Sequence, residues 1–263
     1  MSEIKVLFIG DIVGKAARKA VCCYLAKLKN KYQPDLIVAN GENLAHGIGM
    51  TLKTTEEMMA CGIDFFTSGN HVFDKKDIIA HLKKLPIIRP ENYPKAVPGR
   101  GYEILKIGKS KMAIVNLLGR VFTKTLVDCP FRSADKVLRK LAKEKVKLIL
   151  VDMHAEASAE KSALFHYLNG KVSAVLGTHT HVQTADAEIS REGTAFITDV
   201  GAVYAEGSVI GVEKEAILEK FLTAMPKAHE IPESGKCVFN AVFLQFDSKT
   251  GKAKKIEPIY EIV

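Results

Sequence analysis

The sequence predicts an α/β fold whose sheet is largely parallel in the early part of the chain and mixed toward the end. Short apolar runs alternate early with segments whose apolar residues recur every three or four positions, the pattern of βαβ units. Near the C-terminus two strand-like runs follow one another with only a lysine-rich turn between them, which favours mixed sheets.

The strands are predicted from short apolar runs bounded by glycine, proline or polar residues. Pro34 separates the first helical segment from the second strand, and the turn at 108–110 joins two strands in the middle of the chain. The predicted strands cover residues 5–10, 36–39, 64–67, 102–107, 112–116, 148–151, 174–176, 195–198, 238–246 and 256–262.

The helices are predicted where apolar residues recur at helical spacing behind a capping residue. In the first helix, which follows Gly14, the apolar face consists of Ala17, Val21, Leu25 and Leu28. Further helices are expected at 51–60 with Thr51 or Thr54 as cap, from the cap Asp74 through Leu82, and at 133–146, 156–168 and 212–224. Residues 119–132 show no clear period, and we expect them to form a lid over a site.

The composition is typical of a soluble globular protein, with 263 residues, 47% of them hydrophobic and 26% charged. We expect one domain over residues 1–263 and no membrane partner, because no apolar run approaches the roughly 20 residues of a membrane span. Residues 1–5 lead directly into a strand without a signal peptide, which favours a cytoplasmic location. The five cysteines include no CxxC pair, so we expect reduced thiols.

The formal charge of +8 fits an anionic substrate or a nucleic acid. Most of the basic residues are lysines spread over helix faces, however, and a solvated surface explains them equally well. The sequence has no RNA-binding aromatic pattern and no recognition-helix signature.

Metal-type side chains follow five of the predicted strands, and ligands of open α/β folds collect at the carboxyl ends of strands. They are Asp11; Asn40, Glu42 and Asn43; Asn70 and His71; Asp152 and His154; and His179 and His181. Each alone could be a helix cap, a turn residue or a structural histidine. Together they predict a two-metal site, because carboxylates and imidazoles suit iron, manganese or zinc and one carboxylate can bridge two ions.

Two motifs make the prediction specific: Gly-Asn-His at 69–71 and Gly-Thr-His-Thr-His at 177–181. With them the chain resembles the calcineurin-like metallophosphoesterases. It departs from their usual pattern at Val13, where a histidine is expected, and at Asn-Gly-Glu-Asn 40–43. Those departures, together with Gly-Asp-Ile-Val-Gly at 10–14, match the pattern of the narrower bacterial YmdB-like family. The chain resembles this family over nearly its whole length.

The resemblance implies an α/β/β/α sandwich of two mixed sheets flanked by helices, a homo-oligomer and two metal ions, iron or manganese before zinc. One metal would be held by Asp11, Asn43 and His181, and the other by Asn70, His154 and His179. Glu42 would bridge the two metals. His71 would be the general acid and not a ligand.

The implied activity is a phosphodiesterase acting on cyclic nucleotides, 2′,3′-cyclic ones opened at the 2′ oxygen before 3′,5′-cyclic AMP. A hydroxide between the metals would attack phosphorus, and His71 would protonate the leaving alkoxide. A phosphomonoesterase would use the same metals. A further alternative is a regulatory or RNA-binding metalloprotein with little turnover, and RNA ends are another candidate partner.

Overall fold

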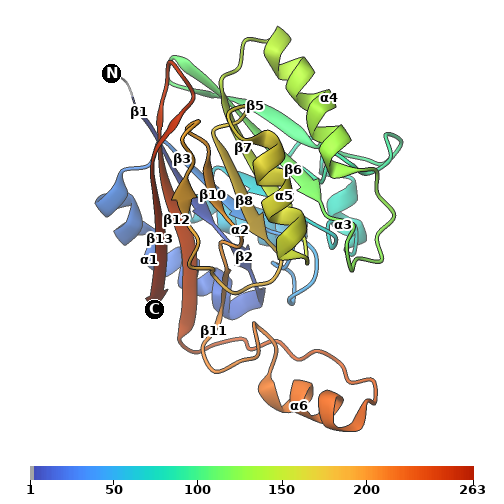
Figure 1. Ribbon diagram of the computed structural model, residues 1–263. Helices are drawn as coiled ribbons and strands as arrows, with labels where there is room; N and C mark the ends of the chain where they lie inside the picture. The colour runs from blue at the N-terminus through green and yellow to red at the C-terminus, as the bar shows by residue number, and fades with distance from the viewer. Residues whose placement is uncertain (1–2) are drawn as a thin grey trace.

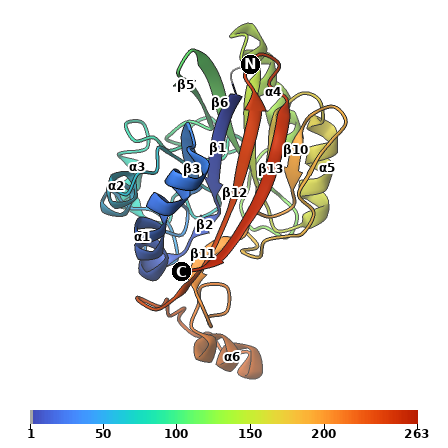
Figure 2. The ribbon, with the colours of Figure 1, turned by 90° about the vertical axis from the view of Figure 1, so that its left-hand side faces the viewer.

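The computed structural model describes residues 3–263. Residues 1 and 2, which belong to the segment expected to lead directly into the first strand, lie outside the described residues. Two β-sheets pack face to face, and helices cover their outer faces (Figures 1 and 2). Both sheets contain parallel and antiparallel pairs. The predicted α/β/β/α sandwich of two mixed sheets is therefore confirmed.

The first sheet has the strand order β2-β11-β12-β1-β3-β4, with β13 paired to β12. Its strands are β1 (Glu3–Ile9), β2 (Asp11–Ile12), β3 (Leu36–Asn40), β4 (Phe65–Thr67), β11 (Ala202–Ala205), β12 (Cys237–Asp247) and β13 (Ala253–Ile262). The helices on its outer side are α1 (Gly14–Tyr32), α2 (Leu52–Ala60) and α3 (Lys76–Ile79). The strands β1, β3 and β4 run parallel, so their carboxyl ends meet at one edge.

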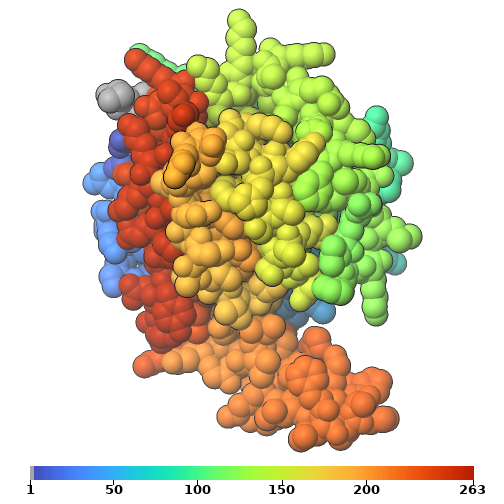
Figure 3. All heavy atoms as spheres, viewed as in Figure 1, coloured from blue at the N-terminus to red at the C-terminus, as the bar shows by residue number. Residues whose placement is uncertain are grey.

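The second sheet has the order β5-β6-β7-β8-β10-β9. Its strands are β5 (Tyr102–Ile107), β6 (Ser110–Leu118), β7 (Leu148–His154), β8 (Ala174–Thr178), β9 (Glu188–Ile189) and β10 (Ala195–Ile197). Helices α4 (Pro130–Lys143) and α5 (Ser158–Leu168) cover its outer face. Helix α6 (Lys214–Thr223) projects from the body of the molecule, as Figure 3 shows in orange.

Alternate residues of the central strands enter different cores, because successive side chains point to opposite faces of a sheet. In β1, Val6 and Phe8 face the second sheet, whereas Leu7 and Ile9 pack with the outer helices. All four are fully buried. This two-sided burial explains why the strands were recognisable as continuous apolar runs.

Several predicted elements need correction. The helix expected from the cap Asp74 through Leu82 is only the short α3, and its N-cap is Lys75. Helix α4 begins at Pro130 instead of Ser133, so the last residues of the predicted lid are helical. The short strands β2, β9 and β11 were not predicted, because strands of two to four residues carry too little pattern. The cap at Thr51 is confirmed, since its hydroxyl accepts from Thr54 N.

The prediction that all five cysteines are reduced thiols is wrong for two of them, because Cys22 and Cys61 form a disulfide. Cys22 lies within α1 and Cys61 directly follows α2, and the packing of these helices brings their Cα atoms to 5.0 Å. Sequence spacing could not show this, because the two residues are 39 positions apart. Cys23, Cys129 and Cys237 are free.

Over residues 3–263, none of the helices combines the length and the apolar character that crossing a bilayer requires.

Candidate metal centre

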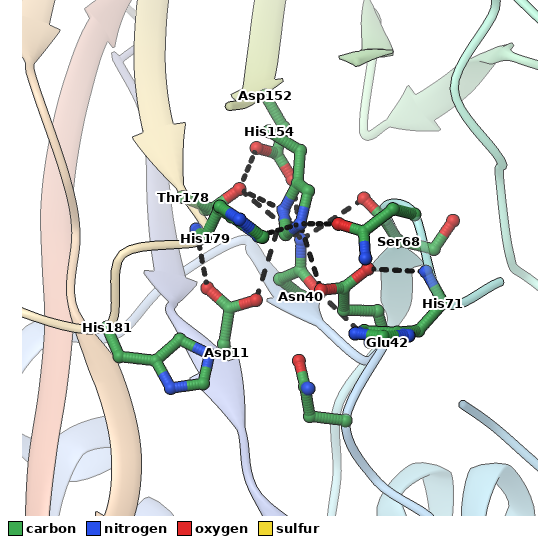
Figure 4. A network of polar contacts seen from close by, with 12 residues as sticks. Asp11, Asn40, Glu42, Ser68, His71, Asp152, His154, Thr178, His179 and His181 are labelled. Carbon is green, nitrogen blue, oxygen red and sulfur yellow. Dashed lines mark hydrogen bonds and ion pairs between the residues drawn. The ribbon is translucent and has the colours of Figure 1, made fainter. Parts of the chain in front are cut away.

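The candidate site lies where strands of both sheets end, and Figure 4 shows its side chains pointing toward one another. In the first sheet Asp11 begins β2, and Glu42 follows β3 after a single glycine. In the second sheet His154 is the last residue of β7 and lies opposite Thr178 of the parallel strand β8. Side chains far apart in sequence meet because the two sheets place the carboxyl ends of these strands at one edge.

Three candidate ligand atoms converge on the ring of His154, which is fully buried and supplies a fourth. Its Nε2 lies 2.9 Å from Glu42 Oε1, 3.0 Å from His179 Nδ1 and 3.2 Å from Asn70 Oδ1. One ligand atom each from Glu42, His154 and His179 falls within 4.8 Å of the others. Two imidazoles, a carboxylate and an amide oxygen at these separations can bind a divalent cation.

Two buried oxygens of the site have no hydrogen-bond partner, Asp11 Oδ1 and Asn43 Oδ1. The other oxygen of Asp11 accepts from His179 N at 3.2 Å, and Asn43 Nδ2 donates to Gly47 O at 2.8 Å. Buried acceptors left unpaired are rare because they lose water without compensation. A carboxylate and an amide oxygen are ordinary metal ligands, so the predicted residues fit a metal on the structure's own evidence.

The ionisable groups of the site shift one another's pKa values. Burial on its own would raise the pKa of Glu42, but His154 lowers it to about 2. Burial opposes protonation of His154, yet the Glu42 carboxylate raises the pKa of that ring to about 9. For His179, burial and then the charge of His154 lower the pKa to about 3, and burial raises the pKa of Asp11. Glu42 and His154 therefore stabilise each other's charged forms.

The ring of His154 is oriented by residues behind it. His154 Nδ1 lies 2.8 Å from Thr178 Oγ1, which donates to Asp152 Oδ1 at 2.7 Å. Asn40 Nδ2 donates to Asp152 Oδ2 at 3.1 Å. Since Nδ1 is occupied on this side, Nε2 is the nitrogen that faces the candidate ligands. The strand-end residues Asn40 and Asp152 thus position the candidate ligand His154.

His181 is also oriented with one nitrogen free. Its Nδ1 lies 2.9 Å from Ile210 O, and because a carbonyl only accepts, Nδ1 carries the proton. The remaining nitrogen, Nε2, can bind a metal, and Figure 4 shows the ring beside Asp11. His179 and His181 both have positive φ, 99° and 66°, which is uncommon for a side chain other than glycine. Such backbone outliers cluster at functional sites.

His71 lies at the rim of the centre and not among the converging ligand atoms. Its backbone N–H donates to Glu42 Oε2 at 3.0 Å, and its Nδ1 lies 2.7 Å from Asp74 Oδ2. Asp74, predicted as a helix cap, instead holds the imidazole of His71. This arrangement leaves Nε2 of His71 available for proton transfer.

Gly69 shows why the Gly-Asn-His motif begins with glycine. A Cβ at this position would overlap Glu42 Oε2 and the imidazole of His154. Any side chain here would occupy the space in which the ligands meet.

A buried ion pair behind the histidine loop was missed by the sequence analysis. Lys161 Nζ lies 2.6 Å from Asp199 Oδ2, and both residues are fully buried. The same oxygen accepts from Thr180 N at 3.0 Å and Thr180 Oγ1 at 2.6 Å, and Oδ1 accepts from Gly201 N at 2.8 Å. Asp199 thereby fixes the residue between the two predicted histidine ligands. The signal was present, because Asp199 follows a predicted strand as Asp11 does.

Two cavities adjoin the centre, and His179 and Glu156 line both. The first, of about 290 Å³, lies under residues 122–125 and also contacts Asn70, Leu118, His154 and Ala155. The second, of about 410 Å³, is lined by Glu42, Asn43, His71, His181, Ile210 and Ile231, among others. The centre is therefore open to a ligand from two sides.

Comparison with known proteins now decides the family. The family model described as YmdB-like protein matches residues 7–259. The chain belongs to the YmdB-like family. The predicted family is thus confirmed. A member from Bacillus subtilis (strain 168), named 2′,3′-cyclic-nucleotide 2′-phosphodiesterase, is 43% identical over 257 residues, covering 97% of this chain and 96% of the relative.

Two solved structures share the fold throughout. A hypothetical protein from Thermus thermophilus has a TM-score of 0.92 at 40% identity, covering 98% of this chain and 99% of that one. A structure described as a novel phosphatase from Mycoplasma pneumoniae has a TM-score of 0.93 at 36% identity, covering 100% and 94%. The metallophosphoesterase-type fold expected of the YmdB-like family is therefore confirmed.

Proposed function

We propose that this chain is a metal-dependent phosphodiesterase that opens cyclic nucleotides, with 2′,3′-cyclic nucleotides as its main substrates. The observation that carries the proposal is the pair of unpartnered buried oxygens, Asp11 Oδ1 and Asn43 Oδ1, beside the converging ligands. The name of the B. subtilis relative, 43% identical over nearly the whole chain, supports the substrate class.

Two metal ions would be held by seven side chains from both sheets. Asp11, Asn43 and His181 would bind one ion, Asn70, His154 and His179 the other, and Glu42 both. Bound metals would lower the pKa of a water molecule to near neutrality and polarise the phosphoryl oxygens. The identity of the metals, the homo-oligomer, the cytoplasmic location and the single domain stay predictions.

The protein's own contribution to the chemistry is proton donation. An alkoxide such as the 2′ oxygen of ribose is a poor leaving group, so a proton must reach it as its bond to phosphorus breaks. His71 lines the larger cavity together with Glu42 and Asn43 and is exposed enough to exchange protons with solvent. Asp74 Oδ2 lies 2.7 Å from its Nδ1, which leaves Nε2 as the nitrogen for proton transfer.

Metal analysis of purified protein combined with a substrate panel tests the proposal. The panel compares 2′,3′-cyclic AMP, 3′,5′-cyclic AMP, bis(p-nitrophenyl) phosphate and the corresponding monoester, before and after chelation. We expect two metals per chain, preference for the 2′,3′-cyclic substrate and loss of activity on chelation. Absence of metal, preference for the monoester, or RNA binding that survives chelation without turnover would contradict it.

A further inference from the structure

The segment between β6 and α4 has a fixed base, although its sequence suggested a lid. Asn92, itself buried, binds both ends of this loop through its side chain. It accepts from Leu118 N at 2.9 Å and donates to Leu118 O at 2.7 Å and Asp128 O at 2.9 Å. These contacts close residues 118–128 into a compact loop whose ends lie together.

A second anchor fixes the residues just before the tip of the loop. The carboxylate of Glu160, on α5, accepts from Arg120 N at 3.0 Å and from Val121 N at 3.1 Å. Glu160 is largely buried, so solvent does not compete for these bonds. The next residue, Phe122, has a φ of 61°, in the left-handed region. The backbone therefore presents Phe122 directly after two residues that Glu160 anchors.

Phe122 is an unpartnered aromatic ring at the wall of the smaller cavity. Phe122 is 86% exposed, so most of its surface is free to contact a ligand. The cavity floor is formed by Asn70, His154 and His179, all candidate metal ligands. Apart from histidines, Phe122 is the one aromatic residue among those that line the two cavities next to the centre within residues 3–263.

We propose that Phe122 is the stacking platform for the base of the nucleotide substrate. The inference rests on the proposed function and assigns the smaller cavity to the nucleoside side of the substrate, with the phosphate at the metal centre. Leu118 and Ala155 provide apolar contacts in the same cavity. Because every base has an aromatic face, such a platform distinguishes nucleotides from base-free phosphodiesters but discriminates little among the bases.

The test compares hydrolysis of 2′,3′-cyclic AMP and 2′,3′-cyclic CMP with that of glycerol 1,2-cyclic phosphate, which has the reactive ring but no base. We expect Phe122→Ala to lower the ratio of kcat/KM for either nucleotide to kcat/KM for the glycerol ester by about 5- to 100-fold, mainly through KM. Phe122→Trp should keep the ratio. Leu126→Ala is the matched control, since Leu126 lies on the same loop, is 90% exposed and does not line the cavity.

An unchanged ratio in Phe122→Ala, or an equal loss for all three substrates, would overturn the stacking role. If Ile231→Ala lowers the ratio instead, the base occupies the larger cavity and the proposal is wrong. A wild-type protein inactive on all three esters would contradict the proposed function separately. Calorimetry with 3′-AMP and glycerol phosphate then decides the base site, and equal affinity of wild type and Phe122→Ala for 3′-AMP would refute it.

Discussion

Two buried carboxylates, Asp11 and Asp199, have similar surroundings but opposite hydrogen-bonding states. Both are fully buried, and both follow closely on a strand. Asp199 is paired with Lys161 and accepts three more hydrogen bonds, from Thr180 and Gly201. Asp11 accepts one backbone bond, and its other oxygen has no hydrogen-bond partner and only a 3.9 Å contact with His154 Nδ1. A satisfied buried carboxylate supports the fold, whereas an unsatisfied one marks a place where the protein gives up stability for a ligand.

The largest effect is expected from Glu42→Gln, which tests whether the centre is a metal site. The amide bridges two cations poorly, so we expect both metals to weaken and kcat/KM to fall by about 10³-fold or more, because metals contribute several kcal/mol of transition-state stabilisation. Metal content per chain and kinetics measure this. A variant that still holds two metals tightly would remove Glu42 from the bridging position.

His71→Ala tests whether His71 is a proton donor at the rim of the centre or a metal ligand. Since His71 lies outside the converging ligand atoms, we expect unchanged metal content and a loss of about 10²- to 10⁴-fold in kcat for alkyl and ribose esters. Esters with a nitrophenolate leaving group, which need no proton, should lose less. Loss of metal in this variant would make His71 a ligand. Asp74→Asn should reproduce the same pattern more weakly, because the ring keeps its place but loses its anionic partner.

The same chemical change at the two carboxylates gives the sharpest contrast. Asp199→Asn leaves the buried ammonium of Lys161 without a counter-charge, and we expect it to lower the free energy of unfolding by about 3–5 kcal/mol. Asp11→Asn removes a buried charge whose Oδ1 has no hydrogen-bond partner and only a 3.9 Å contact with His154 Nδ1, so the metal-free protein should be as stable as wild type or more so. Urea unfolding of chelated protein measures both. Equal destabilisation by the two changes would mean that Asp11 supports the fold of the metal-free protein as much as Asp199 does.

Asp247, the last residue of β12, provides the smallest effect and a reference away from the candidate metal centre. The backbone N–H of Thr250, and then its hydroxyl and Lys249 N, lower the pKa of this carboxyl to about 2. Its stabilising contribution is complete above about pH 4 and is lost as the pH falls toward 2, because the folded state holds the carboxylate more tightly ionised than the unfolded chain does.

Asp247→Asn should therefore slightly lower stability at pH 7 and reduce the further loss of stability as the pH falls from about 4 to 2. Metal content should not change. Thermal unfolding across this pH range is the measurement. If the variant loses as much stability as wild type between about pH 4 and pH 2, other carboxyl groups cause that loss.

Much of the candidate site could be predicted because its signals are local. Asp11, Glu42, His154 and His179 each follow a recognisable apolar run, and parallel strands bring their carboxyl ends together whatever the details of packing. Asp199 carried the same signal. It was missed because its partner Lys161, the one lysine of α5, carries no sequence signal of burial, and only the structure shows that it is fully buried.

The sequence by itself determined the alternation of strands and helices, the family and the residue types at the strand ends. These depend on side-chain periodicity and on short motifs. The tertiary structure decided the Cys22–Cys61 bond, the Asp74–His71 contact and the exposure of Phe122. Each depends on which distant segments pack against one another, and hydrophobic burial, which drives that packing, is non-directional and leaves no local pattern from which the partner can be inferred.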